Sequence, residues 1–268
     1  MSAVTLYLSE PFAQRALVAG VLVALTCGVV APFVVMRGLA FAVHGTSELA
    51  FTGAAAGLLL ADDPLLGALV GALIVAATIG ALGVRERERD AAIGVILAFG
   101  LGLGVYLLGR TRGFASAATN ILFGNIFGVG TRQLAVLVAI AVVVTAVMAT
   151  LARPLLFASA DPKVARVRGV PERALGIVFL LVLALAVTAA AQVVGTLLVL
   201  SLAIAPAASA RRWSADPMVV IALSVVFAIA SGVGGILAAL AVGTVKPSVF
   251  VTSISFAIYL ASRVRRGR

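Results

Sequence analysis

Charged residues are scarce in this 268-residue chain. They make up 11% of it, whereas hydrophobic residues make up 63%. Soluble domains average about 25% charged residues, so a water-soluble globular domain is excluded. The mean hydropathy is +1.21, and apolar runs near the length of about 20 residues that a spanning helix needs recur throughout. The composition therefore predicts an all-α polytopic membrane protein, with eight to nine transmembrane helices in a single domain, residues 1–268.

Other scarcities exclude particular sites. Cys27 is the only cysteine, so no intrachain disulfide can form, and we expect it to be a small core residue. The only lysines, Lys163 and Lys246, do not lie in a G-x-x-x-x-G-K-[ST] sequence, so the chain cannot supply a P-loop for ATP. Trp213 is the only tryptophan, which disfavours a permease with a wide aromatic cavity for a metal chelate or vitamin. The net charge of +10 does not indicate nucleic-acid binding, because the basic residues flank apolar spans.

The apolar runs predict up to nine spans, and a broken helix in place of two adjacent crossings is the alternative. The expected ranges are 12–35, 39–60, 64–84, 91–109, 133–152, 174–191, 194–210, 217–240 and 248–262. With the N-terminus outside, 15 of the 20 basic residues fall on the cytoplasmic side. The positive-inside rule therefore favours an outside N-terminus and a cytoplasmic C-terminus.

Two segments between spans are expected to be structured. Residues 110–132 are apolar but too short to cross a membrane, which predicts a re-entrant or packed helix. Residues 153–173 are the longest polar stretch, in which Asp161 is expected to cap a short basic helix that begins at Pro162. Gly169 and Pro171 would end that helix. A docking surface and a solvated connector are both compatible with this pattern.

Glycines at GxxxG spacing occur as Gly53–Gly57, Gly67–Gly71 and Gly100–Gly104. This spacing lets helix backbones approach closely. In a chain with 27 glycines, ordinary tight packing is the expected role.

His44, the only histidine, and Glu48, the only acidic residue well inside an apolar span, are the candidate functional residues. At i,i+4 spacing a helix places the imidazole and the carboxylate on one face, one turn apart. Ionisable groups within spans are costly and mark ion pathways, and both groups are common ligands of divalent transition metals. A structural pair that hydrogen-bonds internally is the alternative.

The neighbouring polar residues are expected to be structural. Thr46 and Ser47 should bond to the backbone or to neighbouring helices. Asp90 should cap the helix that follows it or pair with nearby arginines.

Five stretches, in the same order, resemble the permease subunits of ABC-type importers for manganese, zinc and iron ions. The first, residues 43–53, resembles the pattern G-D-A-L-S-H-A-x-L-P-G. His44 falls on the family's aspartate and Glu48 on its histidine, an exchange that keeps one imidazole and one carboxylate. The others are DAAIG at 90–94, LFGNIFG at 122–128, the segment 161–171, and QVVGTLLV at 192–199 with Pro206-Ala207-Ala208 following.

The resemblance implies an ABC importer permease-like bundle in the cell membrane of a prokaryote. Its expected partners are cytoplasmic ABC ATPase subunits, an extracytoplasmic metal-binding protein and a second permease protomer, most simply in a homodimer. His44 and Glu48 would hold the transported ion at the dimer axis, with Zn²⁺ favoured on imidazole content and Mn²⁺ next. No permanently bound cofactor is expected, and the chain would be a transport subunit, not an enzyme. The cytoplasmic loop 153–173 would contact the ATPase through Asp161, Pro162, Lys163, Arg166, Gly169 and Pro171.

The sequence also bears on two other functions. An intramembrane metalloenzyme is disfavoured, because no H-E-x-x-H sequence and no second histidine are present. An ion-coupled secondary transporter or channel working without an ATPase is the remaining alternative. Such proteins carry several buried ionisable residues, whereas this chain has essentially one buried acid.

Overall fold

The structure is a computed structural model that describes residues 10–82, 86–111, 114–243 and 245–264. In these ranges the chain forms helices and no β-strand. The long helices are α2 (Pro11–Met36), α3 (Ala40–Ala61), α4 (Pro64–Leu82), α5 (Glu86–Gly109), α7 (Thr131–Ala160), α9 (Glu172–Val194), α12 (Pro217–Val242) and α13 (Pro247–Val264). The short helices are α6 (Phe114–Phe123), the 3₁₀ helix η1 (Ile126–Gly128), α8 (Pro162–Val167), α10 (Val199–Ala203) and α11 (Ala205–Trp213).

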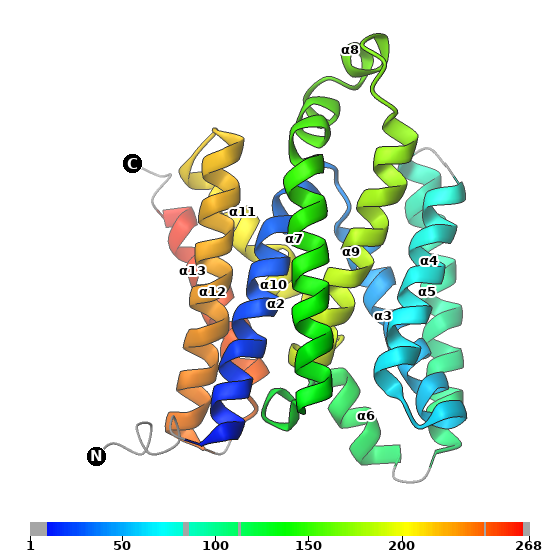
Figure 1. Cartoon of the computed structure of the whole chain (residues 1–268), viewed down its shortest axis with the longest axis vertical. Coiled ribbons are helices and arrows are strands. Elements are labelled where there is room, and N and C mark those ends of the chain that lie inside the picture. The colour runs from blue at the N-terminus through cyan, green and yellow to red at the C-terminus, as the bar shows by residue number, and fades with distance from the viewer. Residues whose placement is uncertain (1–9, 83–85, 112–113, 244, 265–268) are drawn as a thin grey trace.

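The long helices lie side by side in one bundle (Figure 1). Within the described ranges, six are long and apolar enough to cross a membrane, namely α2, the part of α5 from Asp90 onward, α7, α9, α12 and α13. Helices α3 and α4 run beside them (Figure 1). The predicted all-α bundle is confirmed, with a helix count that agrees with the prediction; the predicted end of the third span, residues 83–84, lies outside the described residues.

Residues 194–210 form the broken-helix alternative instead of one uninterrupted span. Gly195 adopts a φ of +100°, which ends α9, and α10 and α11 follow as separate short helices. The break between them falls at Ile204, with Pro206 at the start of α11. A proline has no N–H to continue a helix and clashes with the preceding turn, which explains why a second break falls here.

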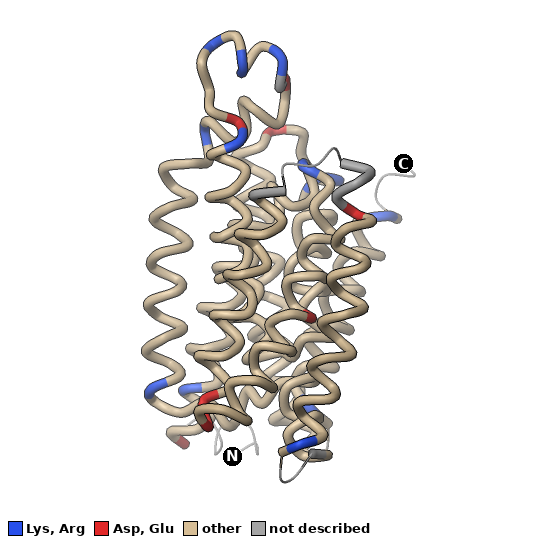
Figure 2. Tube along the Cα trace, turned by 90° about the vertical axis from the view of Figure 1, so that its right-hand side faces the viewer, with Lys and Arg blue, Asp and Glu red and all other residues tan. Residues whose placement is uncertain are grey.

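Most charged residues lie near the two ends of the bundle (Figure 2). Helix α2 begins at the end where α6 lies, and α13 ends near the opposite end, from which α8 projects (Figure 1). The first described helix therefore begins, and the last one ends, at opposite ends of the bundle.

Glycines hold α3 tightly against its neighbours. A Cβ atom on Gly57 would lie 2.8 Å from the Cα atom of Gly67, and one on Gly71 would lie 3.0 Å from the Cα atom of Gly53. Gly100 and Gly104 likewise allow α5 to contact Leu49 and Phe51 of α3. The packing role expected for these GxxxG pairs is confirmed. The close contacts at the glycines determine which face of α3 lies against α4.

The expected packed helix in 110–132 is α6. Its C-terminal end meets the turn between α9 and α10, where the backbone N–H groups of Thr196 and Leu197 donate to the carbonyls of Ile121 and Leu122 at 3.2 and 3.3 Å. Gly124 (φ +74°) and Gly195 (φ +100°) lie at this junction. A Cβ atom on either glycine would clash with the backbone of the other segment, so only glycine fits at both positions.

The polar stretch 153–173 contains the expected capped helix, α8. The Asp161 side chain accepts a hydrogen bond from the Val164 backbone N–H at 3.1 Å, and Gly169 has a φ of +78° just after the helix. The loop is shorter than predicted, because α7 continues through Pro154 to Ala160. Of the two roles expected for Asp90, the helix cap is not formed, because α5 begins at Glu86 and Asp90 lies inside that helix; pairing with nearby arginines stays a prediction.

Candidate functional site

Helix α3 carries both His44 and Glu48. The hydroxyl of Thr46 donates to the Ala42 carbonyl at 2.7 Å, and that of Ser47 donates to the His44 carbonyl at 2.9 Å. Both therefore bond to their own helix backbone, as expected for Thr46 and Ser47. This leaves the imidazole and the carboxylate as the chemically distinct groups on this turn of the helix.

The other faces of α3 are occupied. Gly53 and Gly57 contact α4, and the Thr52 hydroxyl lies 2.6 Å from the Gly100 carbonyl of α5. His44 and Glu48 lie on the side of the helix opposite to the two glycines, because the spacing of 9 residues between His44 and Gly53 corresponds to about half a turn. The pair thus faces away from the tightest helix contact in its surroundings.

The two side chains are withdrawn from the protein surface. Glu48 is 2% exposed, and His44 is half-buried. Within the described residues, neither Glu48 Oε2 nor His44 Nδ1 has a hydrogen-bond partner, although both atoms are buried. Buried polar atoms are rarely left unpaired, so the alternative of an internally hydrogen-bonded pair does not fit this geometry. Two unsatisfied ligand atoms one turn apart can accept a cation.

One protomer alone does not offer a complete metal cage. The described part of the chain contains no group of three or more His, Cys, Asp or Glu residues that could hold a metal ion. A transition-metal site with four protein ligands would therefore need ligands from outside this protomer.

The residues expected to contact an ATPase are on or beside α8, at the far end of the bundle from α6 (Figure 1). Asp161, Lys163 and Arg166 are exposed, and Arg166 pairs with Glu172 of α9 at 3.0 Å. Val167, the last residue of α8, is 90% exposed. Helix α8 thus presents an apolar and basic surface that nothing in the described chain covers.

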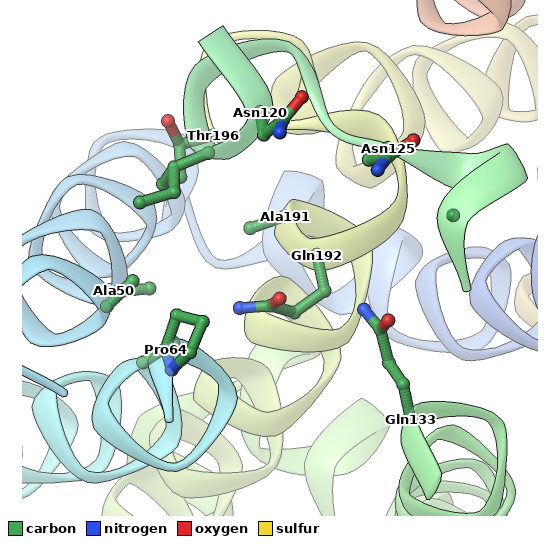
Figure 3. Close-up of a pocket in the computed structure, with 12 residues that line it drawn as sticks. Ala50, Pro64, Asn120, Asn125, Gln133, Ala191, Gln192 and Thr196 are labelled. Atoms are coloured by element: carbon green, nitrogen blue, oxygen red, sulfur yellow. The ribbon is translucent and has the colours of Figure 1, made fainter. Parts of the chain in front are cut away.

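Sequence reasoning missed a third group of residues. A cavity of about 150 Å³ lies among α3, α4, α6, α7 and α9 and is lined by Asn120, Asn125, Gln133, Gln192 and Thr196 together with apolar and glycine residues (Figure 3). Four of these five lie in or beside the stretches 122–128 and 192–199, which were noted only as motifs. The available signal was composition: the chain has only five Asn and Gln residues, and four of them line this cavity.

Comparison with known proteins assigns nearly all of the chain to one family. The model of the ABC 3 transport family matches residues 9–266. A manganese transport system membrane protein, MntC, of Halalkalibacterium halodurans is 31% identical over 230 residues, which are 85% of this chain and 79% of that protein. The high-affinity zinc uptake system membrane protein ZnuB of Haemophilus influenzae is 28% identical over 253 residues, 93% of this chain and 97% of that protein.

A solved structure shares the fold. The structure of PsaBC from Streptococcus pneumoniae in complex with a Fab superimposes with a TM-score of 0.85 at 26% identity, covering 96% of this chain and 92% of that one.

Proposed function

The chain belongs to the ABC 3 transport family and is a membrane-spanning permease subunit; on that premise we propose that it passes a divalent transition-metal ion between the His44 and Glu48 side chains of two protomers. As an ABC importer permease it is a transport subunit of the plasma membrane, not an enzyme, and it works with an ATPase and a substrate-binding protein. Family membership also sets aside a transporter or channel that works without an ATPase.

The observation that carries the proposed site is the pair of buried, unpartnered atoms, His44 Nδ1 and Glu48 Oε2. Across a two-fold axis, two copies of α3 would offer two imidazole nitrogens and up to four carboxylate oxygens. That ligand set suits Zn²⁺, Mn²⁺ or Fe²⁺ and is a poor cage for Mg²⁺. A homodimer is therefore part of the proposal, because one described protomer supplies too few ligands.

Imidazole content favours Zn²⁺ as the transported ion, with Mn²⁺ next. Relatives named for manganese and for zinc match at similar identity, 31% and 28%. The ion would be delivered at the α6 end of the bundle by the binding protein. ATP binding and hydrolysis, transmitted through α8, would switch the side to which the site opens.

The test is metal uptake by the reconstituted complex of permease, ATPase and binding protein. We expect His44→Ala and Glu48→Ala each to reduce uptake by about 10–100-fold or more. Losses of about this size are typical when residues that only hydrogen-bond to metal ligands are mutated. Assembly with the ATPase should be unchanged. Metal-dependent ATPase activity, compared for Zn²⁺, Mn²⁺ and Fe²⁺, identifies the preferred ion.

Two matched controls sharpen this test. Thr46→Val lies between the two ligands but bonds only to its own helix, and it should transport normally. The double variant His44→Asp, Glu48→His exchanges the two ligand types and should keep measurable transport, because an imidazole and a carboxylate are both retained. Normal metal accumulation by the two alanine variants refutes the proposed site.

A further inference from the structure

The polar cavity shown in Figure 3, here called the amide cavity, gathers nearly all the carboxamide side chains of the chain. Asn120 lies near the C-terminal end of α6, Asn125 just before η1, Gln133 at the start of α7 and Gln192 near the end of α9. Their amide groups surround one space (Figure 3). Four separate parts of the chain therefore contribute the same functional group to one site.

These amides lack partners within the protein. Among the described residues no hydrogen bond joins Asn120, Asn125, Gln133 or Gln192 to another side chain or to the backbone through its amide group. The hydroxyl of Thr196, which also lines the cavity, is buried without a partner. Asn120 and Asn125 are exposed, whereas Gln133 and Gln192 are half-buried. Water or a polar ligand that enters the cavity can therefore pair with these amides and with the buried Thr196 hydroxyl, whose unsatisfied state would otherwise cost free energy.

The chemistry of the lining favours a cation that keeps part of its water. Carboxamide oxygens are ligands of hard divalent cations, and the amide N–H groups can hydrogen-bond retained water. A cavity of about 150 Å³ has room for several water molecules. None of the 12 lining residues is charged, so no lining side chain repels a cation, and none binds it as tightly as a carboxylate would.

A neighbouring cavity provides a contrast. It has a volume of about 270 Å³ and shares Asn120 and Asn125 with the amide cavity, but Lys246 also lines it. The Lys246 ammonium group lies 3.4 Å from the Thr119 carbonyl and over the Phe123 ring. Its charge disfavours a divalent cation there, so the amide cavity is the better cation site of the two.

We propose that the amide cavity is a second, weaker cation site, which receives the partly hydrated ion at the α6 end of the bundle before His44 and Glu48 bind it. The α6 end of the bundle lies opposite to the end from which α8 projects (Figure 1). This step rests on the proposed function, in which the binding protein delivers the ion at that end. The binding step itself concerns only the Asn and Gln side chains and can be measured without transport.

Manganese binding to the purified permease–ATPase complex tests the site, with Mn²⁺ alone as the probe and the paramagnetic resonance signal of free Mn²⁺ as the readout. We expect two classes of site in the wild type, the weaker with a Kd on the order of 10⁻⁴–10⁻³ M, the range of weak oxygen-donor sites. The double variant Gln133→Leu, Gln192→Leu should weaken that class at least about tenfold, a change of about 1.4 kcal/mol. His44→Ala with Glu48→Ala should remove the tighter class alone.

Gln14→Leu is the matched control, because Gln14 is the fifth carboxamide residue of the chain and does not line the amide cavity. It should keep both classes of site. The thermal stability of the Gln133→Leu, Gln192→Leu variant should equal or exceed that of the wild type, since no internal hydrogen bond is lost; a marked decrease would indicate a structural role for the amides.

Unchanged Mn²⁺ binding by the Gln133→Leu, Gln192→Leu variant overturns the proposed site. If that variant instead binds Mn²⁺ normally but loses affinity for the metal-binding protein, the cavity accepts a partner side chain and the proposal is again wrong. If the weak class disappears as expected while His44→Ala and Glu48→Ala transport normally, the amide cavity stands and the function proposed for His44 and Glu48 fails.

Discussion

Asp63 connects three helices at the turn between α3 and α4. One carboxylate oxygen accepts the backbone N–H of Leu66 at 3.1 Å, which caps the start of α4. The other oxygen pairs with Arg132 of α7 at 2.7 Å. The Leu66 hydrogen bond first, and the Arg132 guanidinium after it, hold the pKa of Asp63 below its ordinary value.

A lowered pKa in the folded state predicts acid sensitivity. The ionised carboxylate contributes stability at pH values above the ordinary aspartate pKa of about 3.9, and this contribution is lost as the pH falls through the lower folded value. We expect the unfolding temperature of the wild type to fall below about pH 4 more steeply than that of Asp63→Asn. At pH 7 the wild type should be slightly more stable than Asp63→Asn, and the two should converge in acid; the margin is small because Arg132 is 79% exposed and surface ion pairs contribute little.

The control for this prediction is Asp62→Asn, which changes the adjacent carboxyl group at a left-handed position that asparagine tolerates. It should leave the fall of the unfolding temperature at acidic pH as it is in the wild type. The same fall at acidic pH in the wild type and in Asp63→Asn would contradict the role assigned to Asp63.

At the level of residues, the sequence was enough to find ionisable residues, which are rare inside apolar spans. His44 and Glu48 were found because a single histidine and a single buried acid stand out against 63% hydrophobic residues. The amide cavity was missed, because its members lie far apart in the sequence and no local spacing relates them. That the two ligand atoms lack partners could not be predicted either, since it depends on which helix faces lie against α3.

At the level of elements, α8 is the segment that we expect to contact the ATPase, because most of its described side chains are exposed. The Asp161 cap fixes the N-terminus of α8, and Gly169, in the left-handed conformation, sets the direction of the chain after the helix. An L-residue in that conformation costs about 1–2 kcal/mol. We expect Gly169→Ala to displace the α8–α9 turn, to reduce co-purification of the ATPase and to lower ATP-driven transport several-fold, measured on the assembled complex.

Gly109→Ala is a suitable control for this change. Gly109 ends α5, and a Cβ atom there would meet nothing within 4 Å. Undiminished co-purification and transport by Gly169→Ala would argue against the coupling role of α8.

Hydropathy predicted the long helices well because each one needs about 20 apolar residues to cross a membrane. It predicted less well where the backbone itself interrupts an apolar run. Residues 194–210 contain no charge that would mark a break, and the breaks arise instead at Gly195 and Ile204. Conversely, α7 continues eight residues past the predicted end at 152, because the helix accommodates Pro154.

At the level of the whole molecule, α2 begins and α13 ends at opposite ends of the bundle (Figure 1). The excess of basic residues on one side predicts an outside N-terminus and a cytoplasmic C-terminus, and this prediction requires α2 to begin and α13 to end at opposite ends of the bundle. Reporter fusions to each terminus test the orientation. An enzyme active only in the cytoplasm should be active at the C-terminus and inactive at the N-terminus, and the reverse pattern would invert the transport direction inferred for the bundle.

The family match across residues 9–266 and the TM-score of 0.85 show that the chain shares the fold of a permease subunit. Neither the sequence nor a single protomer shows the second copy, because contacts between subunits are absent from both. The two-ligand set on α3 is the chemical reason to expect that second copy.

The junction of Gly124 and Gly195 has a mechanical consequence. Main-chain hydrogen bonds link the end of α6 to the turn before α10, with no side chain in between that could yield. A displacement of α6 must therefore carry the start of α10 with it, or break both bonds. Widening of the bundle at this end is thus a concerted motion of two interrupted segments and not the swing of one isolated helix.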